Sequence, residues 1–229
     1  MRRVVLSVAI VFFTSYCVGQ AKRVVPTDAW QPPETFGASA GKACGNPSTG
    51  MKYLDCFTAQ MAKAGAPAGA VGFTREFYKD NHSEFGILMR VTRNGKLNIG
   101  WVVYPLHRPS NYGLFIVNGD PEFVNTEDLK QLDQKAMEQS YQFQGLKSLF
   151  PKVTLYPGNR NGLTWPNVQM GPDGWQFIVG YPLRNGCPTC SDAGHALFTW
   201  NFNLDGKFLG TSFQGLTPPP LTSPVSSPQ

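Results

Sequence analysis

The chain has 229 residues, of which 41% are hydrophobic and 15% charged, a length that allows one large domain or two small ones around a substantial core. The few charges, together with 24 Gly and 19 Pro, favour a turn-rich β protein over a helical bundle. The net charge of +5 falls to +3 if Arg2 and Arg3 leave with the first 21 residues, and the remaining basic residues are scattered, which argues against nucleic-acid binding.

Residues 1–21 have the features of a secretory signal peptide. Two arginines are followed by an apolar run over residues 4–13 and by the small-x-small site Gly19-Gln20-Ala21, which predicts cleavage near Ala21. The run is too short to span a bilayer, which needs about 20 apolar residues. Cys17 raises lipidation as a second alternative, with a bulky Tyr16 against it, and a retained anchor ranks third. We expect a periplasmic or secreted protein with no transmembrane segment in the mature chain.

Both ends of the mature chain are expected to lie outside the folded part. Residues 22–49 carry Pro, Gly and Ser without a period, which predicts a flexible N-terminal arm. Residues 217–229 read TPPPLTSPVSSPQ, a composition typical of a disordered tail. A single α+β domain is therefore predicted over residues 50–216.

The folded part begins with a helical pattern that changes to a strand pattern. Leu54, Phe57 and Met61 recur at helical spacing, and Gly65-Ala66-Pro67 predicts a break before a second helix.

After residue 81 the apolar period becomes two, which predicts the first hairpin. A three-residue loop at Arg93-Asn94-Gly95 would place Val91 opposite Leu97 and Met89 opposite Ile99, and we expect this register because it pairs every apolar side chain.

Two further strands and a helix are predicted next. The second strand ends at Tyr104-Pro105-Leu106, strands follow at 112–117 and 122–124, and Asn125 or Thr126 is expected to cap one helix that ends by Pro151.

The layout then repeats. A strand ends at Tyr181-Pro182-Leu183, a polar loop and another strand follow, and a Leu204-Asp205-Gly206 loop sets Phe202 opposite Phe208. We therefore predict an α+β fold of two similar units, 51–125 and 126–213, each with a helix and a four-stranded antiparallel sheet. A chance recurrence of the Tyr-Pro-Leu triplet is the alternative. The two sheets could join or pack as neighbours.

Cysteine spacing predicts disulfides. Four cysteines remain after signal removal, with three possible connectivities, and pairing Cys44 with Cys56 and Cys187 with Cys190 is the natural choice. A redox Cys-x-x-Cys would need a following helix, whereas a strand is predicted after Cys190. A zinc site would need four ligands, and one pair with His195 falls short. Structural disulfides are favoured, and no metal or cofactor is predicted.

A possible binding site lies in the loops after the two Tyr-Pro-Leu strands. If the units are related by a two-fold axis, these loops would bring together His107, Arg108, Arg184 and His195. The alternative is that each is a solvated loop residue.

No nucleophile-elbow, zincin, Walker or dinucleotide-binding motif is present. We therefore expect a non-catalytic binding or interaction protein whose partner is another envelope or extracellular protein. One alternative is a thiol-disulfide protein acting through Cys187 and Cys190. Another is a hydrolase that uses His107 or His195.

Overall fold

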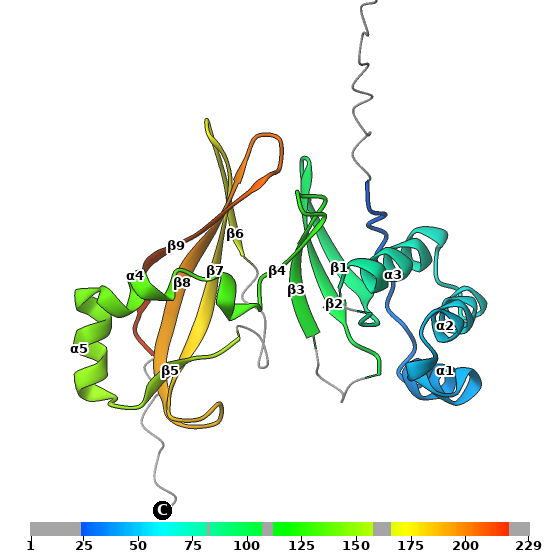
Figure 1. Ribbon diagram of the computed structural model, residues 1–229, viewed down its shortest axis with the longest axis horizontal. Helices are drawn as coiled ribbons and strands as arrows, with labels where there is room; N and C mark the ends of the chain where they lie inside the picture. The colour runs from blue at the N-terminus through cyan, green and yellow to red at the C-terminus, as the bar shows by residue number, and fades with distance from the viewer. Residues whose placement is uncertain (1–23, 82, 107–111, 158–165, 220–229) are drawn as a thin grey trace, which may run out of the picture.

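The computed structural model describes residues 24–81, 83–106, 112–157 and 166–219 (Figure 1), and it has the predicted α+β composition with two separate antiparallel sheets. The helices are α1 (Phe36–Cys44), η1 (Pro47–Thr49), α2 (Met51–Lys63), α3 (Ala68–Asp80), η2 (Leu129–Gln131), α4 (Gln134–Gln139) and α5 (Tyr141–Leu149). The strands are β1 (Ile87–Asn94), β2 (Leu97–Val103), β3 (Tyr112–Val117), β4 (Phe123–Asn125), β5 (Val153–Leu155), β6 (Asn167–Gly171), β7 (Gly174–Asn185), β8 (Asp192–Asn203) and β9 (Phe208–Thr217).

The first sheet is a four-stranded meander and the second sheet has five strands. The first follows the order β1-β2-β3-β4, and the second follows β5-β7-β8-β9 with β6 also paired to β7. Strand β5 was not expected; it pairs with the end of β7 that carries Leu183, Arg184 and Asn185. The second unit therefore departs from the predicted four strands, while β6 to β9 alone form a meander like that of the first sheet.

The first sheet is covered on both faces. On one face Leu88, Val102 and Phe115 pack against Phe73 and Phe77 of α3. On the opposite face the alternate residues of β2 and β3 are buried against the second sheet: Leu97, Ile99, Leu114 and Ile116. This sheet is therefore a middle layer between helices α1–α3 and the second sheet (Figure 1).

The second sheet has one buried face. Its inner face carries the buried residues Phe177, Val179, Tyr181, Leu183, Ala196, Phe198, Trp200 and Phe202. Met137 of α4 and Phe143 of α5 belong to the same cluster as the inner residues of the first sheet. Helices α4 and α5 and the first sheet thus cover this face together. Burial of this largely apolar core is the main contribution to the stability of the fold.

The segment for which the sequence predicts a flexible arm holds helix α1 and buried side chains. Phe36 and Ala40 of α1 pack in one cluster with Tyr53 and Phe57 of α2. Nearer the start, Val25 is 1% exposed. The signal missed in the sequence was the pair Phe36 and Ala40, which lie four residues apart and so share one helix face. At the other end β9 reaches Thr217, one residue into the predicted tail.

The single helix predicted before Pro151 is three short helices. Each begins at a side chain that accepts a hydrogen bond from the backbone: Asp128 from the Lys130 amide, Asp133 from the Ala136 amide and Ser140 from the Phe143 amide. Asp and Ser in such positions compete with helix continuation and favour a new N-terminus. The apolar residues keep a helical spacing across these breaks, and the sequence pattern therefore predicted one continuous helix.

The register predicted for the first hairpin was wrong. Asn94 pairs with Leu97 and Val91 pairs with Gly100. The loop is the two-residue Gly95-Lys96, with Gly95 at φ +61, a turn that favours glycine at its first central position. The register also shifts between Leu88 and Arg90. A bulge of this kind moves the following side chains to the opposite face, so the alternating apolar residues do not share one side.

The last hairpin confirms its prediction. Phe202 pairs with Phe208, the Asn203 amide donates to the Lys207 carbonyl, and Gly206 has φ +86. A left-handed residue at this position is where a three-residue loop requires glycine.

The turns of the two sheets meet at one end of the molecule. The Asp120 amide donates to the Gly206 carbonyl at 2.8 Å, and the Phe208 amide donates to the Asp120 carbonyl at 2.9 Å. Trp175 packs so closely on Gly95 that a Cβ added there would lie 2.8 Å from the indole. Hairpins of the two sheets are therefore joined by backbone hydrogen bonds as well as by the apolar core. In the described part of the chain, no helix is long and apolar enough to cross a membrane.

Candidate functional site

Two of the four predicted loop residues lie together on the second sheet. Arg184 is opposite Asp192 and His195 is opposite Pro182, and the pair Leu183–Gly194 lies between them in the β7–β8 ladder. Paired residues and their second neighbours share a face, so Arg184 and His195 are on one side of the sheet. His107 and Arg108 lie outside the described residues, so the contact predicted between the two loops stays a prediction.

The Asp192 carboxylate, which lies beside Arg184 and His195, has both a hydrogen bond and an ion pair. It accepts a hydrogen bond from the Gly194 amide at 2.8 Å and pairs with the Arg184 guanidinium at 2.8 Å. Burial raises the pKa of Asp192, but the Gly194 and Arg184 hydrogen bonds and the nearby His195 outweigh burial and hold the pKa below its ordinary value. This pair joins β7 to β8 where the two strands meet the loop of their hairpin.

The Cys187–Cys190 disulfide closes the tip of that hairpin. Its Cα atoms are 5.0 Å apart, the Cys190 amide donates to the Cys187 carbonyl, and Cys190 is exposed. Strand β8 begins two residues after Cys190, at Asp192. A thiolate here would lack the helix N-terminus that stabilises reactive Cys-x-x-Cys sites. The local geometry therefore suits a clasp on a turn.

The Cys44–Cys56 disulfide links the end of α1 to α2. Its Cα atoms are 5.6 Å apart, and both cysteines are half-buried. The predicted connectivity is thus the one that the structure has, and it fastens α1 next to the cluster around Phe36 and Phe57.

The sheet also presents an outer face that sequence reasoning did not single out. We define it by the side chains that alternate with the buried residues on β6 to β9: Gln169, Gln176, Ile178, Thr199, Asn201 and Ser212. Gln169 and Gln176 are exposed, and of the others only Thr199 is buried. The signal in the sequence is the polar residues Thr199 and Asn201, which alternate with the buried aromatic residues of β8.

Amide groups on the outer face are linked by hydrogen bonds. The Gln176 amide donates to Asn201 Oδ1 at 3.4 Å. Asn201 Nδ2 is 3.4 Å from the Thr199 carbonyl, 3.4 Å from the Gly210 carbonyl and 3.2 Å from Ser212 Oγ. These bonds restrain long polar side chains before any ligand arrives, which lowers the entropy lost on binding.

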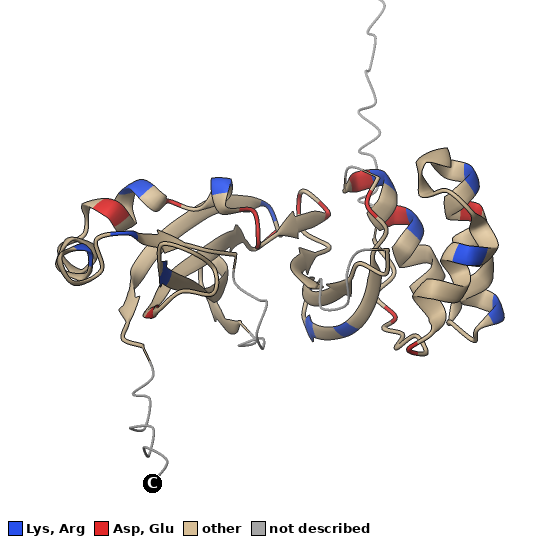
Figure 2. Cartoon of the chain, turned by 90° about the horizontal axis from the view of Figure 1, so that it is seen from below, with Lys and Arg blue, Asp and Glu red and all other residues tan. Residues whose placement is uncertain are grey.

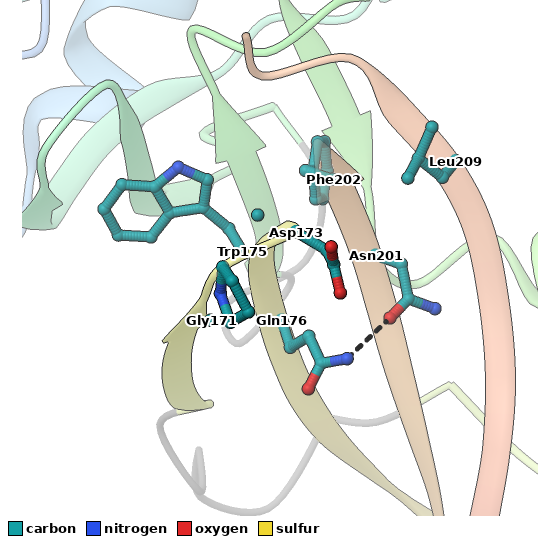
Figure 3. A pocket seen from close by; sticks show the side chains of 9 residues that line it. Gly171, Asp173, Trp175, Gln176, Asn201, Phe202 and Leu209 are labelled. Carbon is teal, nitrogen blue, oxygen red and sulfur yellow. Dashed lines mark hydrogen bonds between the residues drawn. The ribbon is translucent and has the colours of Figure 1, made fainter. Parts of the chain in front are cut away.

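A pocket of about 400 Å³ lies where the outer face meets the β6–β7 turn (Figure 3). Asp173, Gln176 and Asn201 lie near one another in this view, while the Trp175 indole extends away from them. The lining residues are Gly171, Pro172, Asp173, Gly174, Trp175, Gln176, Asn201, Phe202 and Leu209. The volume falls in the range of small-ligand sites, which combine apolar walls with a few polar groups.

Charges elsewhere are mixed in sign. Figure 2 shows Lys and Arg together with Asp and Glu along the helices, and few charged residues on the strands. In the described ranges no three His, Cys, Asp or Glu side chains come close enough to hold a metal ion.

The comparisons with known proteins give no relative from which a function could be transferred. No protein-family model, curated protein or solved structure matches this chain.

Proposed function

We propose that this protein is an exported, non-catalytic binding protein whose partner is another envelope or extracellular protein. Two features support export. The first 21 residues combine a basic start, a short apolar run and a small-residue cleavage site. The folded part carries two disulfides, which persist in oxidising compartments.

The observation that carries the binding role is the outer face of the second sheet. Its polar side chains are amides and hydroxyls, and Gln176, Asn201 and Ser212 form a hydrogen-bonded row across it. Such groups donate and accept, so they suit the polar surface of a protein better than a lipid or an apolar small molecule.

Photo-crosslinking tests this role in the full mature chain. A photoreactive residue replaces exposed Gln169 on the outer face, and a control replaces exposed Lys52 on α2. We expect one partner to be captured from envelope extract at Gln169 and none at Lys52. The purified partner should then bind Ser212→Trp at least tenfold more weakly than Ser148→Trp, a matched change on exposed α5. Equal capture at both sites, or turnover in a hydrolase panel, contradicts the proposal.

Export has its own test. Mass spectrometry of the protein recovered from the periplasm or medium should show a chain that starts at Lys22. A lipid on Cys17, or a chain that keeps Met1, would overturn cleavage near Ala21.

We further propose that the two sheets are copies of one unit. The supporting observations are that β1–β4 and β6–β9 are both antiparallel meanders, and that a Tyr-Pro-Leu triplet directly follows the second strand of the first and lies within the second strand of the other. Superposition with Tyr104 placed on Tyr181 tests this: a duplication requires α3 and α5 to fall on the same face, and opposite faces contradict it.

A thiol-disulfide role is the second candidate, and the exposure of Cys190 at a hairpin tip favours it. An external thiolate would attack one sulfur and release the other as a protein thiolate. A second external thiolate would then attack the external sulfur of the mixed disulfide, which leaves Cys187 and Cys190 reduced and the two external thiols joined as a disulfide. A reduction potential below about −300 mV would mark the bond as structural.

A further inference from the structure

The orientation of Asn201 fixes which atoms line the pocket at the β6–β7 turn. Its Nδ2 lies 3.4 Å from two backbone carbonyls, those of Thr199 and Gly210. Carbonyl oxygens only accept, so the amide nitrogen must be the atom on that side. Asn201 Oδ1 therefore points toward Gln176.

The orientation of Gln176 follows from that of Asn201. Only a donor can face Asn201 Oδ1, so the Gln176 amide nitrogen takes this position, at 3.4 Å. The Gln176 carbonyl oxygen then remains, and no described side chain or amide donates to it. Asp173 is exposed on the turn and is the one charged residue among those that line the pocket. The side-chain atoms left for a ligand thus include three acceptors, two carboxylate oxygens of Asp173 and the amide oxygen of Gln176, beside the second N–H of Gln176.

Apolar residues, Leu209 and Pro172, line the same pocket as these acceptors. Leu209 is 61% exposed, at the point where the β8–β9 register shifts between Asn201 and Phe202, and it lines the same pocket as Pro172. An exposed leucine beside a carboxylate fits a ligand that has an apolar stem and a charged head. Lysine and arginine side chains have this form, because their methylene stems pack on apolar surface while the head stays in polar surroundings.

We propose that this pocket receives a basic side chain, arginine or lysine, from the partner polypeptide. This inference rests on the proposed binding function and names the residue class that the outer face selects. The head group donates to Asp173 and to the Gln176 carbonyl oxygen, and the stem lies on Leu209. An anionic or purely apolar group is disfavoured, because Asp173 is the one charged residue among those that line the pocket and it is negative.

The test is a titration of the full mature protein followed by amide NMR shifts. The probes are N-acetyl-arginine amide and N-acetyl-lysine amide, with N-acetyl-norleucine amide and N-acetyl-glutamate as matched neutral and anionic ligands. We expect the two basic probes to shift the amides of Asp173, Gln176, Asn201 and Leu209. The binding should weaken as salt rises, because exposed charges are screened.

Two pairs of variants locate the charge. Asp173→Asn should weaken arginine binding about two- to fivefold, the range of an exposed ion pair, and Asp173→Lys should abolish it. Asp205→Asn and Asp205→Lys make the same changes on the exposed β8–β9 turn, outside the pocket, and should leave binding unchanged. Equal loss in both pairs would mean a general charge effect and would overturn the site.

The outcomes separate this inference from the binding function itself. Norleucine or glutamate binding as well as arginine, or the absence of any shift at Asp173 with the basic probes, overturns the basic-side-chain site even if Gln169 crosslinks a partner. A failed crosslink with intact, Asp173-dependent arginine binding overturns the proposed partner surface and leaves the pocket chemistry standing.

Discussion

The Tyr181 hydroxyl donates a hydrogen bond to the Thr126 carbonyl, 2.6 Å away, and so ties the second sheet to the segment that leaves the first. The same hydroxyl accepts from Trp200 Nε1 at 2.9 Å, and Thr126 Oγ1 donates to the Leu114 carbonyl at 2.8 Å. These groups are buried. Burial raises the pKa of Tyr181 far above its ordinary value, so this hydroxyl stays protonated and keeps donating.

Replacement of Tyr181 by Phe should lower the free energy of unfolding by about 1–3 kcal/mol, because it leaves the Trp200 indole and the Thr126 carbonyl buried without a partner. Tyr156→Phe is the matched control. Its hydroxyl bonds to the Gly186 carbonyl at 3.2 Å in an exposed position, where water replaces the lost bond. Urea unfolding of both variants measures the difference, and equal losses would contradict a buried network.

Removal of the Asp192 carboxylate should destabilise the protein in a pH-dependent way. The folded-state pKa lies below the ordinary value of 3.8, so the stabilisation is fully present above about pH 4 and is lost as the pH falls through the folded pKa. Asp192→Asn should therefore have a lower urea midpoint than wild type at neutral pH and approach the wild type at roughly pH 2. Asp205→Asn, whose exposed carboxylate is 3.9 Å from Lys96, should show no such convergence, because exposed pairs contribute little. A pH-independent deficit for Asp192→Asn would contradict the ion-pair explanation.

The two disulfides should differ in ease of reduction and in contribution to stability. Cys190 is exposed whereas Cys44 and Cys56 are half-buried, so limited dithiothreitol should reduce Cys187–Cys190 first. By loop-closure entropy, Cys187→Ser with Cys190→Ser should lose about 2 kcal/mol and Cys44→Ser with Cys56→Ser about 3 kcal/mol. Thiol counting by mass spectrometry follows the order of reduction. Simultaneous reduction of both disulfides would show that the exposure of Cys190 does not control how fast dithiothreitol reaches each bond.

Glycine replacements at two positions should have opposite signs. Gly95 has φ +61, and a Cβ there would lie 2.8 Å from the Trp175 ring, so Gly95→Ala should destabilise by about 1–3 kcal/mol. Gly145 is inside α5 with nothing within 4 Å of an added Cβ, and Gly145→Ala should stabilise by up to about 1 kcal/mol. Thermal unfolding of the pair checks the contact between the hairpins.

Sequence periodicity predicted the elements better than their pairing. The β8–β9 hairpin was predicted in register because a Gly206-terminated three-residue loop and the Phe202–Phe208 pair point to the same alignment. The β1–β2 hairpin was not, because its loop is Gly95-Lys96 and its apolar residues are buried on both faces of the middle sheet. An alternating pattern assumes one buried face, and a strand buried on both faces does not obey it.

The candidate site was predictable only in part. Arg184 and His195 were both among the predicted site residues, and they lie on one face of the sheet because Arg184 precedes and His195 follows the same cysteine loop. The acceptor pocket brings together Asp173 and Leu209, which are far apart in the chain. Their place on one pocket depends on the register of three strands and on the register shift at Leu209, neither of which a local pattern contains.

The backbone pairing of Asp120 with Gly206 and Phe208 sets an order for assembly of the molecule. The first sheet can pair its own strands early, since its neighbours in space are neighbours in sequence. Its inner side chains, such as Leu97 and Ile116, remain uncovered until β7 and β8 arrive. The N-terminal half alone would therefore expose an apolar surface, and surfaces of this kind favour aggregation.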